Sequence, residues 1–327
     1  MKQYLDLQRK VLTLGDKKED RTGTGTISLF GEKMVFDLRE GFPLITTKEV
    51  NFKHVINELL WFLSGSTDVG DLIRAGTNIW NKDSYRWYQS IRLEMENNNN
   101  IGDVTEELSY REFIQAVRNG MSFNLGPIYG AQWRKSFGTD QIKDLMDKLS
   151  HEPNSRRLIV SAWNPSLTSY MALPPCHILF QTYSVDIPDN EMDKIRDNYR
   201  YLLPRTLTDE QFEDRLPKKY LDLQMYQRSC DLFLGVPYNV SSYSALMVMM
   251  GSQLNMIPRF FHWLGGDVHI YNDHIEAVKE QLQRKPGSLP KLVVNTNVKD
   301  IYSYTIEDFQ LYDYSPQSQI KAPLSVG

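Results

Sequence analysis

Cysteine is scarce in this chain, since only Cys176 and Cys230 occur among its 327 residues. Two cysteines do not make the disulfide framework of a small secreted protein, so we expect a cytoplasmic protein with reduced thiols. A zinc site is disfavoured, because "CH" at 176–177 lacks the C-x-x-C spacing and adjacent side chains of a strand point to opposite faces. We predict no metal, and Cys176 remains either a buried apolar residue or a nucleophile.

Long apolar runs and blocks of one charge are missing as well. No stretch approaches the ~18 apolar residues that a membrane-spanning helix needs. The amphipathic, mixed-charge start of the chain is unlike a signal peptide. Basic and acidic residues are interspersed and leave a net charge of −4, which argues against sequence-independent binding of nucleic acid. Neither a membrane nor a nucleic acid is therefore expected as a partner.

The composition that is present, 41% hydrophobic and 24% charged, is that of a globular protein. Apolar spacing predicts helices at 2–14, 49–65 and 240–254, the second closed by Gly65. Alternating patterns predict a hairpin at 22–41 and strands at 156–165, 176–186, 220–231 and 260–271. We expect an α+β fold with a mixed sheet, in one domain over residues 1–327.

Two stretches stand apart from these patterns. Residues 81–124 contain "ENNNN" and several aromatic residues, and residues 187–219 are dense in charge. We interpret both as surface insertions that hold short helices and carry no chemistry.

Several polar residues stand in settings that suit chemistry. Two prolines fix the approach to Cys176, and nearby arginines would favour its thiolate. Arg228 and Ser229 place a guanidinium fork beside a hydroxyl, a pair that suits a phosphate. Asn239 follows a Gly-Pro turn and either caps that turn or reads an amide edge such as that of uracil.

Further candidates are less specific. Arg21 lies in a Gly/Thr-rich loop without the Lys-Ser/Thr ending of a P-loop. Arg156 and Arg157 adjoin a strand, where adjacent side chains cannot point the same way. His269 and Tyr271 share one strand face and are either structural or bind a sugar hydroxyl. The carboxyl group of Glu58, in an apolar helix, is either salt-bridged or has a pKa raised by burial towards acid/base use.

The order of motifs along the whole chain resembles that of the thymidylate synthase family. The motifs are "DRTGTG", "FPLITTK", "NELLWFLSG", "IW", "GPIYGAQWR", "SRRLIVSAWNP", "LPPCH", "QRSCDLFLGVPYN", "GGDVHIY" and "IKAPLSVG". The resemblance implies a homodimer in which two sheets pack together. It also implies 2'-deoxyuridine 5'-monophosphate (dUMP) as acceptor and 5,10-methylenetetrahydrofolate as one-carbon donor.

Residue roles carry over from this resemblance position by position. Cys176 matches the nucleophile that adds to C6 of uracil. The other residues matched to catalysis are Glu58, Tyr129, Asn239, Asp231 and Arg228. Those matched to nucleotide binding are Arg21, Arg156, Arg157, Arg228, Ser229, Cys230, Asp231, Asn239, His269 and Tyr271, with Arg156 and Arg157 reaching the partner's site. Those matched to folate binding are Lys48, Ile79, Trp80, Asp231, Gly235, Tyr238 and Ser325.

The same scaffold allows two products. A methylene group left on uracil C5 takes a hydride to give dTMP and dihydrofolate, or water to give 5-hydroxymethyl-dUMP and tetrahydrofolate. Asn239 favours uracil over cytosine, and Trp80 favours the synthase. Ser325 stands where alanine is usual in the tail "APLSVG", and the first insertion follows Trp80 directly and could reshape the folate mouth. We expect the synthase, with a dUMP hydroxymethylase as alternative.

A third hypothesis is a member that binds nucleotide, folate or RNA without catalysis. It would need a missing catalytic group. Cys176, Glu58, Asn239 and all four arginines are present, so this hypothesis is disfavoured.

Overall fold

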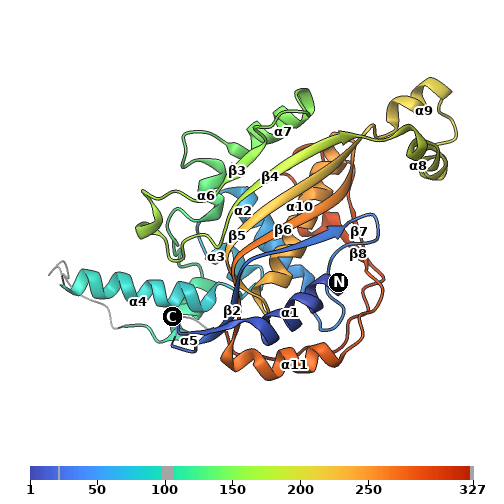
Figure 1. Cartoon of the computed structure of the whole chain (residues 1–327). Helices are drawn as coiled ribbons and strands as arrows, with labels where there is room; N and C mark the ends of the chain where they lie inside the picture. Colours follow the sequence, from blue (N-terminus) through green and yellow to red (C-terminus); the bar gives the residue numbers. More distant parts are fainter. Residues whose placement is uncertain (21–22, 98–106, 325–327) are drawn as a thin grey trace.

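The computed structural model describes residues 1–20, 23–97 and 107–324. Within these residues, six strands form one mixed sheet in the order β1-β2-β6-β5-β4-β3 (Figure 1). These strands are β1 (Asp16–Lys18), β2 (Thr26–Asp37), β3 (Ile159–Ser161), β4 (His177–Asp186), β5 (Lys219–Asp231) and β6 (Met256–Tyr271). Only the β5–β6 pair is parallel in the sheet, and the remaining neighbours are antiparallel. A second pair joins β7 (Lys291–Val294) and β8 (Phe309–Tyr312).

Helices occupy most of the remaining described chain. The α-helices are α1 (Lys2–Leu14), α2 (Phe52–Ser64), α3 (Gly70–Arg74), α4 (Asn81–Asn97), α5 (Tyr110–Arg118), α6 (Tyr129–Arg134), α7 (Gln141–His151), α8 (Asp189–Leu202), α9 (Asp209–Arg215), α10 (Gly235–Leu254) and α11 (Ile275–Gln283). Short 3₁₀ turns are η1 (Thr168–Tyr170), η2 (Asn272–His274) and η3 (Ile306–Asp308). No helix in these parts of the chain is both long and apolar enough to cross a bilayer.

The three helices predicted from apolar spacing are confirmed as α1, α2 and α10. Helix α2 begins where Asn51 caps it, since the Asn51 side chain accepts a hydrogen bond from the backbone N–H of His54. It ends at Gly65, whose φ of 72° lies in the left-handed region. Helix α10 begins earlier than predicted, at Gly235, because Pro237 is tolerated in a first helical turn.

The predicted hairpin at 22–41 is wrong. Residues 26–37 form one strand, β2, that pairs with β6 along its length. The pairing passes from Phe30–Asp267 to Glu32–Gly265, and Gly31 between them has a φ of 82°. Glycine tolerates this positive φ in the middle of a strand, so β2 continues past Gly31 in the same register with β6 and the chain does not reverse. The strand predicted at 156–165 is also shorter than expected, since β3 pairs with β4 only over Ile159–Ser161.

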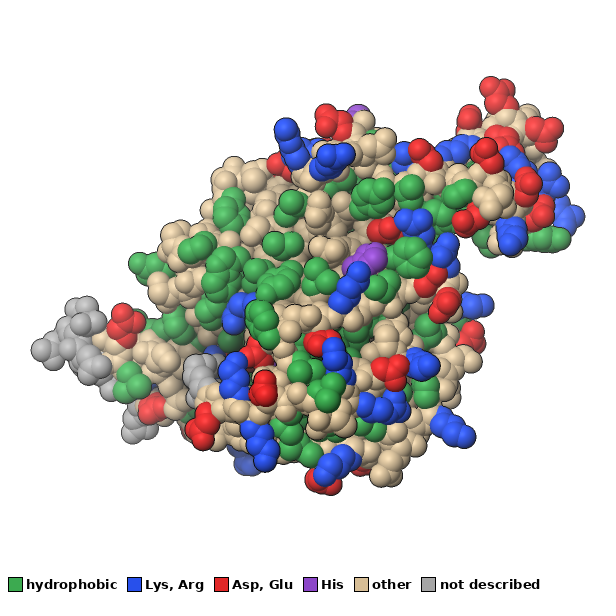
Figure 2. Space-filling view, viewed as in Figure 1, with side chains coloured by type: hydrophobic (Ala, Val, Ile, Leu, Met, Phe, Trp, Pro, Cys, Tyr) green, Lys and Arg blue, Asp and Glu red, His purple; other side chains and the backbone are tan. Residues whose placement is uncertain are grey.

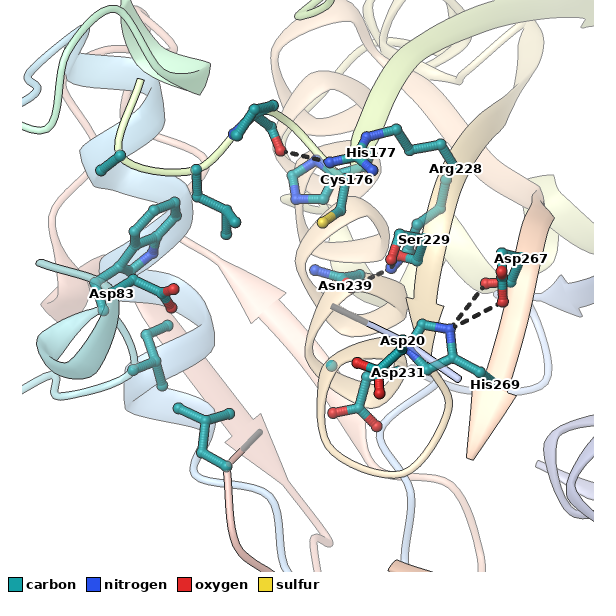
Figure 3. A pocket seen from close by; sticks show the side chains of 18 of the residues that line it. Asp20, Asp83, Cys176, His177, Arg228, Ser229, Asp231, Asn239, Asp267 and His269 are labelled. Carbon is teal, nitrogen blue, oxygen red and sulfur yellow. Dashed lines mark hydrogen bonds and ion pairs between the residues drawn. The ribbon is translucent and has the colours of Figure 1, made fainter. Parts of the chain in front are cut away.

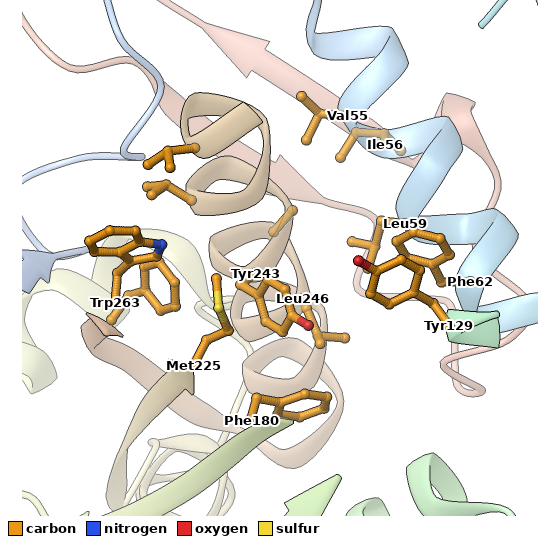
Figure 4. Packing of buried hydrophobic residues seen from close by; sticks show 14 of the residues in the cluster. Val55, Ile56, Leu59, Phe62, Tyr129, Phe180, Met225, Tyr243, Leu246 and Trp263 are labelled. Atoms are coloured by element: carbon orange, nitrogen blue, oxygen red, sulfur yellow. The ribbon is translucent and has the colours of Figure 1, made fainter. Parts of the chain in front are cut away.

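The hydrophobic core lies between the sheet and helices α2 and α10 (Figure 4). Phe180, Met225 and Trp263 stand side by side on β4, β5 and β6, and all are fully buried. Phe62 of α2 and Tyr243 of α10 pack into the same core. One face of the sheet is therefore apolar and covered by these helices. Because side chains alternate along a strand, the intervening residues point to the opposite face of the sheet.

The opposite face of the sheet is left open by the helices in Figure 1. Ile159, Gln181, Gln224, His262 and Val35 are matched across five neighbouring strands on this face. Ile159 is 48% exposed and Val35 is 37% exposed. Figure 2 shows hydrophobic side chains gathered over this surface, which we name the open sheet face.

Among the described residues, each of the two predicted insertions holds two helices. Residues 81–124 contain α4 and α5, and Phe113 and Val117 of α5 are fully buried. Residues 187–219 contain α8 and α9, which project beyond the ends of β4 and β5 (Figure 1). Ile187, Ile195 and Tyr220 form a small separate cluster there.

Gly126, in the turn that leads into α6, allows a direct test of close packing. Its φ is +78°, and a Cβ atom would lie 1.8 Å from the Tyr170 carbonyl oxygen. Gly138 has a φ of +73° with open space around it, so Gly138→Ala should lose only about 1 kcal/mol of backbone preference. We expect Gly126→Ala to lose roughly 2–4 kcal/mol in urea unfolding. Equal losses for the two variants would contradict the close approach.

Candidate active site

A cavity of about 910 Å³ opens where the carboxyl ends of β5 and β6 meet. Because these two strands run parallel, their ends lie at the same edge of the sheet. The other walls are the residues before β4, the start of α10 and helix α4. Twelve of the predicted site residues line it: Glu58, Ile79, Trp80, Tyr129, Cys176, Arg228, Ser229, Asp231, Gly235, Asn239, His269 and Tyr271.

Cys176 is held at the cavity wall by its backbone. Its N–H donates to the Tyr129 hydroxyl at 2.6 Å, and its carbonyl accepts from the Arg228 N–H at 2.7 Å. The Arg228 guanidinium donates to the carbonyls of Pro175 at 2.8 Å and Pro174 at 2.9 Å. Cys176 is partly exposed, so the interpretation as a buried apolar residue is wrong. The two prolines and Arg228 fix the loop that presents the thiol. Figure 3 shows the Cys176 sulfur turned towards Asn239.

Tyr129 rests on a buried histidine. The ring of His177 stacks on that of Tyr129 with centroids 4.1 Å apart, and its Nδ1 lies 2.8 Å from the Tyr243 hydroxyl. Burial lowers the pKa of His177 to about 3, so the ring is neutral. Burial also raises the pKa of Tyr129 well above its ordinary value. His177 therefore positions Tyr129 and carries no charge into the site.

Glu58 lies buried against Trp80. Its Oε1 accepts a hydrogen bond from the indole Nε1 at 2.7 Å. Burial raises the pKa of Glu58 to about 7 although this hydrogen bond acts in the opposite direction. The hydrogen-bond partner of Glu58 is thus a neutral indole, and a buried carboxyl in this setting suits acid/base use.

The amide group of Asn239 is held in one orientation. Gln227 donates from Nε2 to Asn239 Oδ1 at 3.0 Å and accepts at Oε1 from the indole of Trp263 at 2.9 Å. The Asn239 nitrogen is directed into the cavity beneath the Cys176 thiol (Figure 3). Gln227 begins the motif "QRSCDLFLGVPYN", but the motif alone assigns it no role; the structure shows that it orients Asn239.

His269 and Tyr271 both face the cavity, as their spacing predicts. Their ring centroids lie 5.0 Å apart. His269 Nδ1 is 3.2 Å from Asp267 Oδ1, and Lys18 donates to Asp267 Oδ2 at 2.7 Å. The hydrogen bond from His269 is the main cause that lowers the pKa of Asp267 to about 2. The carboxylate thus holds the ring that faces the cavity.

Asp231 ends β5 and starts the turn into α10. Its Oδ1 accepts from the N–H groups of Phe233 at 3.0 Å and Leu234 at 3.1 Å. Burial opposes ionisation, but His274 and these backbone bonds outweigh it and lower the pKa of Asp231. Lys48 lies beneath the turn, where it donates to the Phe233 carbonyl and burial lowers its pKa to about 7. A carboxylate is therefore presented at the far end of the cavity.

Five predicted residues lie apart from the cavity lining. Lys48 and Tyr238 pack behind it, and the thiol of Cys230 is fully buried beside the Gln227 carbonyl. The side chain of Cys230 therefore does not reach a nucleotide in the cavity. Arg156 and Arg157 are exposed before β3. Arg21 and Ser325 lie outside the described residues.

Helix α4 places one face of the first insertion at the cavity, whereas the sequence pattern predicts a surface elaboration. Asp83, Arg86, Trp87 and Ser90 line the cavity at helical spacing, on one face. The helical spacing of these four residues can be read from the sequence. Only the fold shows that this helix face lies against the cavity. In the described parts of the chain, no group of three metal-ligating side chains comes together.

The pKa of Glu58 predicts how stability depends on pH. The folded protein binds this proton up to about pH 7, whereas the unfolded chain releases it near 4.5. Stability should therefore fall as pH rises through this window, by up to about 3 kcal/mol. Glu58→Gln lacks this loss, so its stability relative to wild type should rise between about pH 5 and about pH 8 in urea unfolding.

The matched control for this prediction is Glu276→Gln, on an exposed position of α11. A constant difference between Glu58→Gln and wild type at both pH values would show that Glu58 ionises in the folded protein at its ordinary pKa.

Comparison with known proteins agrees with this geometry. A family model described as thymidylate synthase matches residues 2–326. The chain is 40% identical over 332 residues to the thymidylate synthase of Aster yellows witches'-broom phytoplasma and 41% identical over 332 residues to that of Mycoplasma mobile. It is 42% identical over 347 residues to the thymidylate synthase of Listeria innocua, and each alignment covers 100% of both chains. The resemblance drawn from the order of motifs is thereby confirmed, and the chain belongs to the thymidylate synthase family.

Proposed function

We propose that this enzyme, a one-carbon transferase by its family, methylates dUMP at C5 with 5,10-methylenetetrahydrofolate and releases dTMP and dihydrofolate. The observation that carries the proposal is the thiol of Cys176 placed over the amide of Asn239 (Figure 3). A pyrimidine held by that amide presents its C6 to the sulfur. These substrates are a free nucleotide and a free folate, as expected of a cytoplasmic enzyme.

The nucleotide fits along the ends of β5 and β6. The Asn239 nitrogen, fixed by Gln227, donates to a uracil carbonyl, where the amino group of cytosine would meet a second donor. His269 and Tyr271 face the cavity where a ribose hydroxyl would lie. Ser229 and the Arg228 guanidinium supply a hydroxyl and a cation for the phosphate, with Arg21 as a further ligand.

The folate fits on the other side of the cavity. The Asp231 carboxylate accepts N–H groups of an aminopyrimidinone ring, and its lowered pKa keeps it an acceptor. Ile79 and Trp80 provide an apolar wall, and the Trp80 ring is held edge-on to Trp61 with centroids 5.6 Å apart. Gly235 leaves room at the start of α10. A folate bound there supplies the one-carbon group and the hydride.

The residues around the pyrimidine divide the chemistry. The Cys176 sulfur adds to C6, which makes C5 nucleophilic. The Arg228 cation, bonded to the loop that carries the thiol, favours the thiolate. Glu58 and the Tyr129 hydroxyl lie on the cavity wall, and Glu58 can take up and release a proton near neutral pH. These residues would serve formation of either dTMP or 5-hydroxymethyl-dUMP. The choice between hydride and water in the final step is therefore measured separately.

We also propose that two copies pack through the open sheet face. Apolar side chains of several strands gather there, and an uncovered apolar sheet is normally buried against another layer. Arg156 and Arg157 are exposed near this face and do not line the cavity of their own chain. Packing of two sheets would let them reach the phosphate in the partner's site.

The first prediction tests the reaction. Incubation with dUMP and methylenetetrahydrofolate should give a methylated nucleotide by mass spectrometry together with dihydrofolate by absorbance. Cys176→Ser should bind dUMP but lose at least ~10³-fold in turnover, because the hydroxyl is a far weaker nucleophile. Unchanged turnover in this variant would exclude the mechanism. A hydroxymethylated product without dihydrofolate would identify the hydroxymethylase instead.

The second prediction tests the shared site. Arg156→Ala combined with Arg157→Ala should weaken the partner's site, whereas Cys176→Ser inactivates its own. Dimers that contain one subunit of each kind should regain one working site, because the intact thiol then meets intact arginines. Each variant alone serves as the control. Mixtures that show no activity beyond the sum of the two variants would count against arginines supplied by a partner.

A further inference from the structure

The last described residues of the chain lie against the cavity. Leu324 is part of its lining, beside residues from α4. We name Pro323 and Leu324 the C-terminal tail, and side chains bind the backbone carbonyls of both residues. The Pro323 carbonyl accepts from His274 Nε2 at 2.7 Å, and the Leu324 carbonyl accepts from Lys82 Nζ at 3.2 Å. The tail is thus held from two sides at the mouth of the site.

His274 holds the tail from inside the protein. Its side chain has no exposed surface, and its Nδ1 lies 3.7 Å from Asp231 Oδ1. Burial alone would lower the pKa of His274, but Asp231 and the Pro323 carbonyl outweigh it and raise the pKa. One ring nitrogen of His274, Nε2, therefore contacts the tail, and the other, Nδ1, is directed at Asp231, the carboxylate expected to bind folate.

Lys82 holds the tail from outside, and its position is unusual. It is exposed in the first turn of α4, where the partial positive charge of the helix N-terminus disfavours a cation. A partner carbonyl on another segment compensates for this placement. The residues that follow on the same helix, including Asp83 and Trp87, line the cavity. One helix of the first insertion therefore supplies both a wall of the cavity and a contact to the tail.

We propose that Lys82 is a positioning residue that holds the C-terminal tail, anchored at His274, over the cavity mouth and so limits the entry of water. This inference rests on the proposed function. It assigns to the first insertion a part in choosing between the two products, since a closed site excludes water from reactive groups.

The chemistry of that choice is a competition at one carbon. The methylene on C5 accepts a hydride from tetrahydrofolate, which becomes dihydrofolate, and a methyl group results. Alternatively the methylene accepts hydroxide from water, whose remaining proton passes to solvent, and tetrahydrofolate stays reduced. In both cases the electron pair of the exocyclic double bond reforms the C5=C6 bond, the bond between C6 and sulfur breaks, and the Cys176 thiolate leaves. The ratio of hydroxymethyl to methyl product therefore measures how well the tail excludes water.

Three lysine variants test the proposal. Lys82→Met removes the hydrogen-bond donor and keeps a side chain of similar length, whereas Lys82→Arg keeps a donor at this position. Lys143→Met, at an exposed lysine paired with Asp147 on α7, is the matched control. Loss of a hydrogen bond worth about 1 kcal/mol should raise the product ratio and the KM for folate about fivefold, with the KM for dUMP unchanged. Lys82→Arg and Lys143→Met should match wild type.

A second measurement does not depend on catalysis. Carboxypeptidase should remove residues through Leu324 about fivefold faster from Lys82→Met than from wild type, followed by intact mass in the absence of ligands. Equal trimming of all variants would overturn the proposal, even if the reaction itself is established. An inactive wild type would instead refute the proposed function, while faster trimming would still support the contact between Lys82 and the tail. Faster trimming with an unchanged product ratio would overturn the role in excluding water.

Discussion

The arrangement of the site depends on the one parallel pairing in the main sheet, between β5 and β6. Parallel neighbours need a long crossover, and the buried helix α10 provides it. The carboxyl ends of both strands and the first turn of α10 therefore meet at one edge. Ser229 and Asp231 come from β5, Asn239 from α10, and His269 and Tyr271 from β6. Residues up to 42 positions apart in the chain become one wall because of this single connection.

Arg228 has two consequences for the Cys176 loop. Its guanidinium donates hydrogen bonds to the Pro174 and Pro175 carbonyls, which fixes the loop before β4. The same cation adds a positive charge to the segment that carries the thiol. Geometry and electrostatics at Cys176 are therefore set by one side chain, and the flat fork of arginine suits this better than lysine.

The sequence predicted the parts of the fold that depend on local patterns. Helices α1, α2 and α10 follow from apolar spacing, and Gly65 closes α2 as expected. The hairpin prediction at 22–41 failed because β2 pairs along its whole length with β6, more than 200 residues away, and alternation does not identify a partner. Among site residues, motifs identified those that face the cavity. Gln227 and His274 were missed, because residues that orient others have no pattern until the fold brings their partners near.

Charge and proton exchange occupy different parts of the cavity wall. Asp267 and Asp231 have lowered pKa values and stay ionised, so they can accept hydrogen bonds without changing state. Around Tyr129, burial keeps His177 neutral and raises the pKa of Glu58 to about 7. A proton can therefore move at Glu58 near neutral pH while these two carboxylates keep their charge. The apolar packing around Trp80 produces this separation, since it is the lack of water around Glu58 that shifts its pKa.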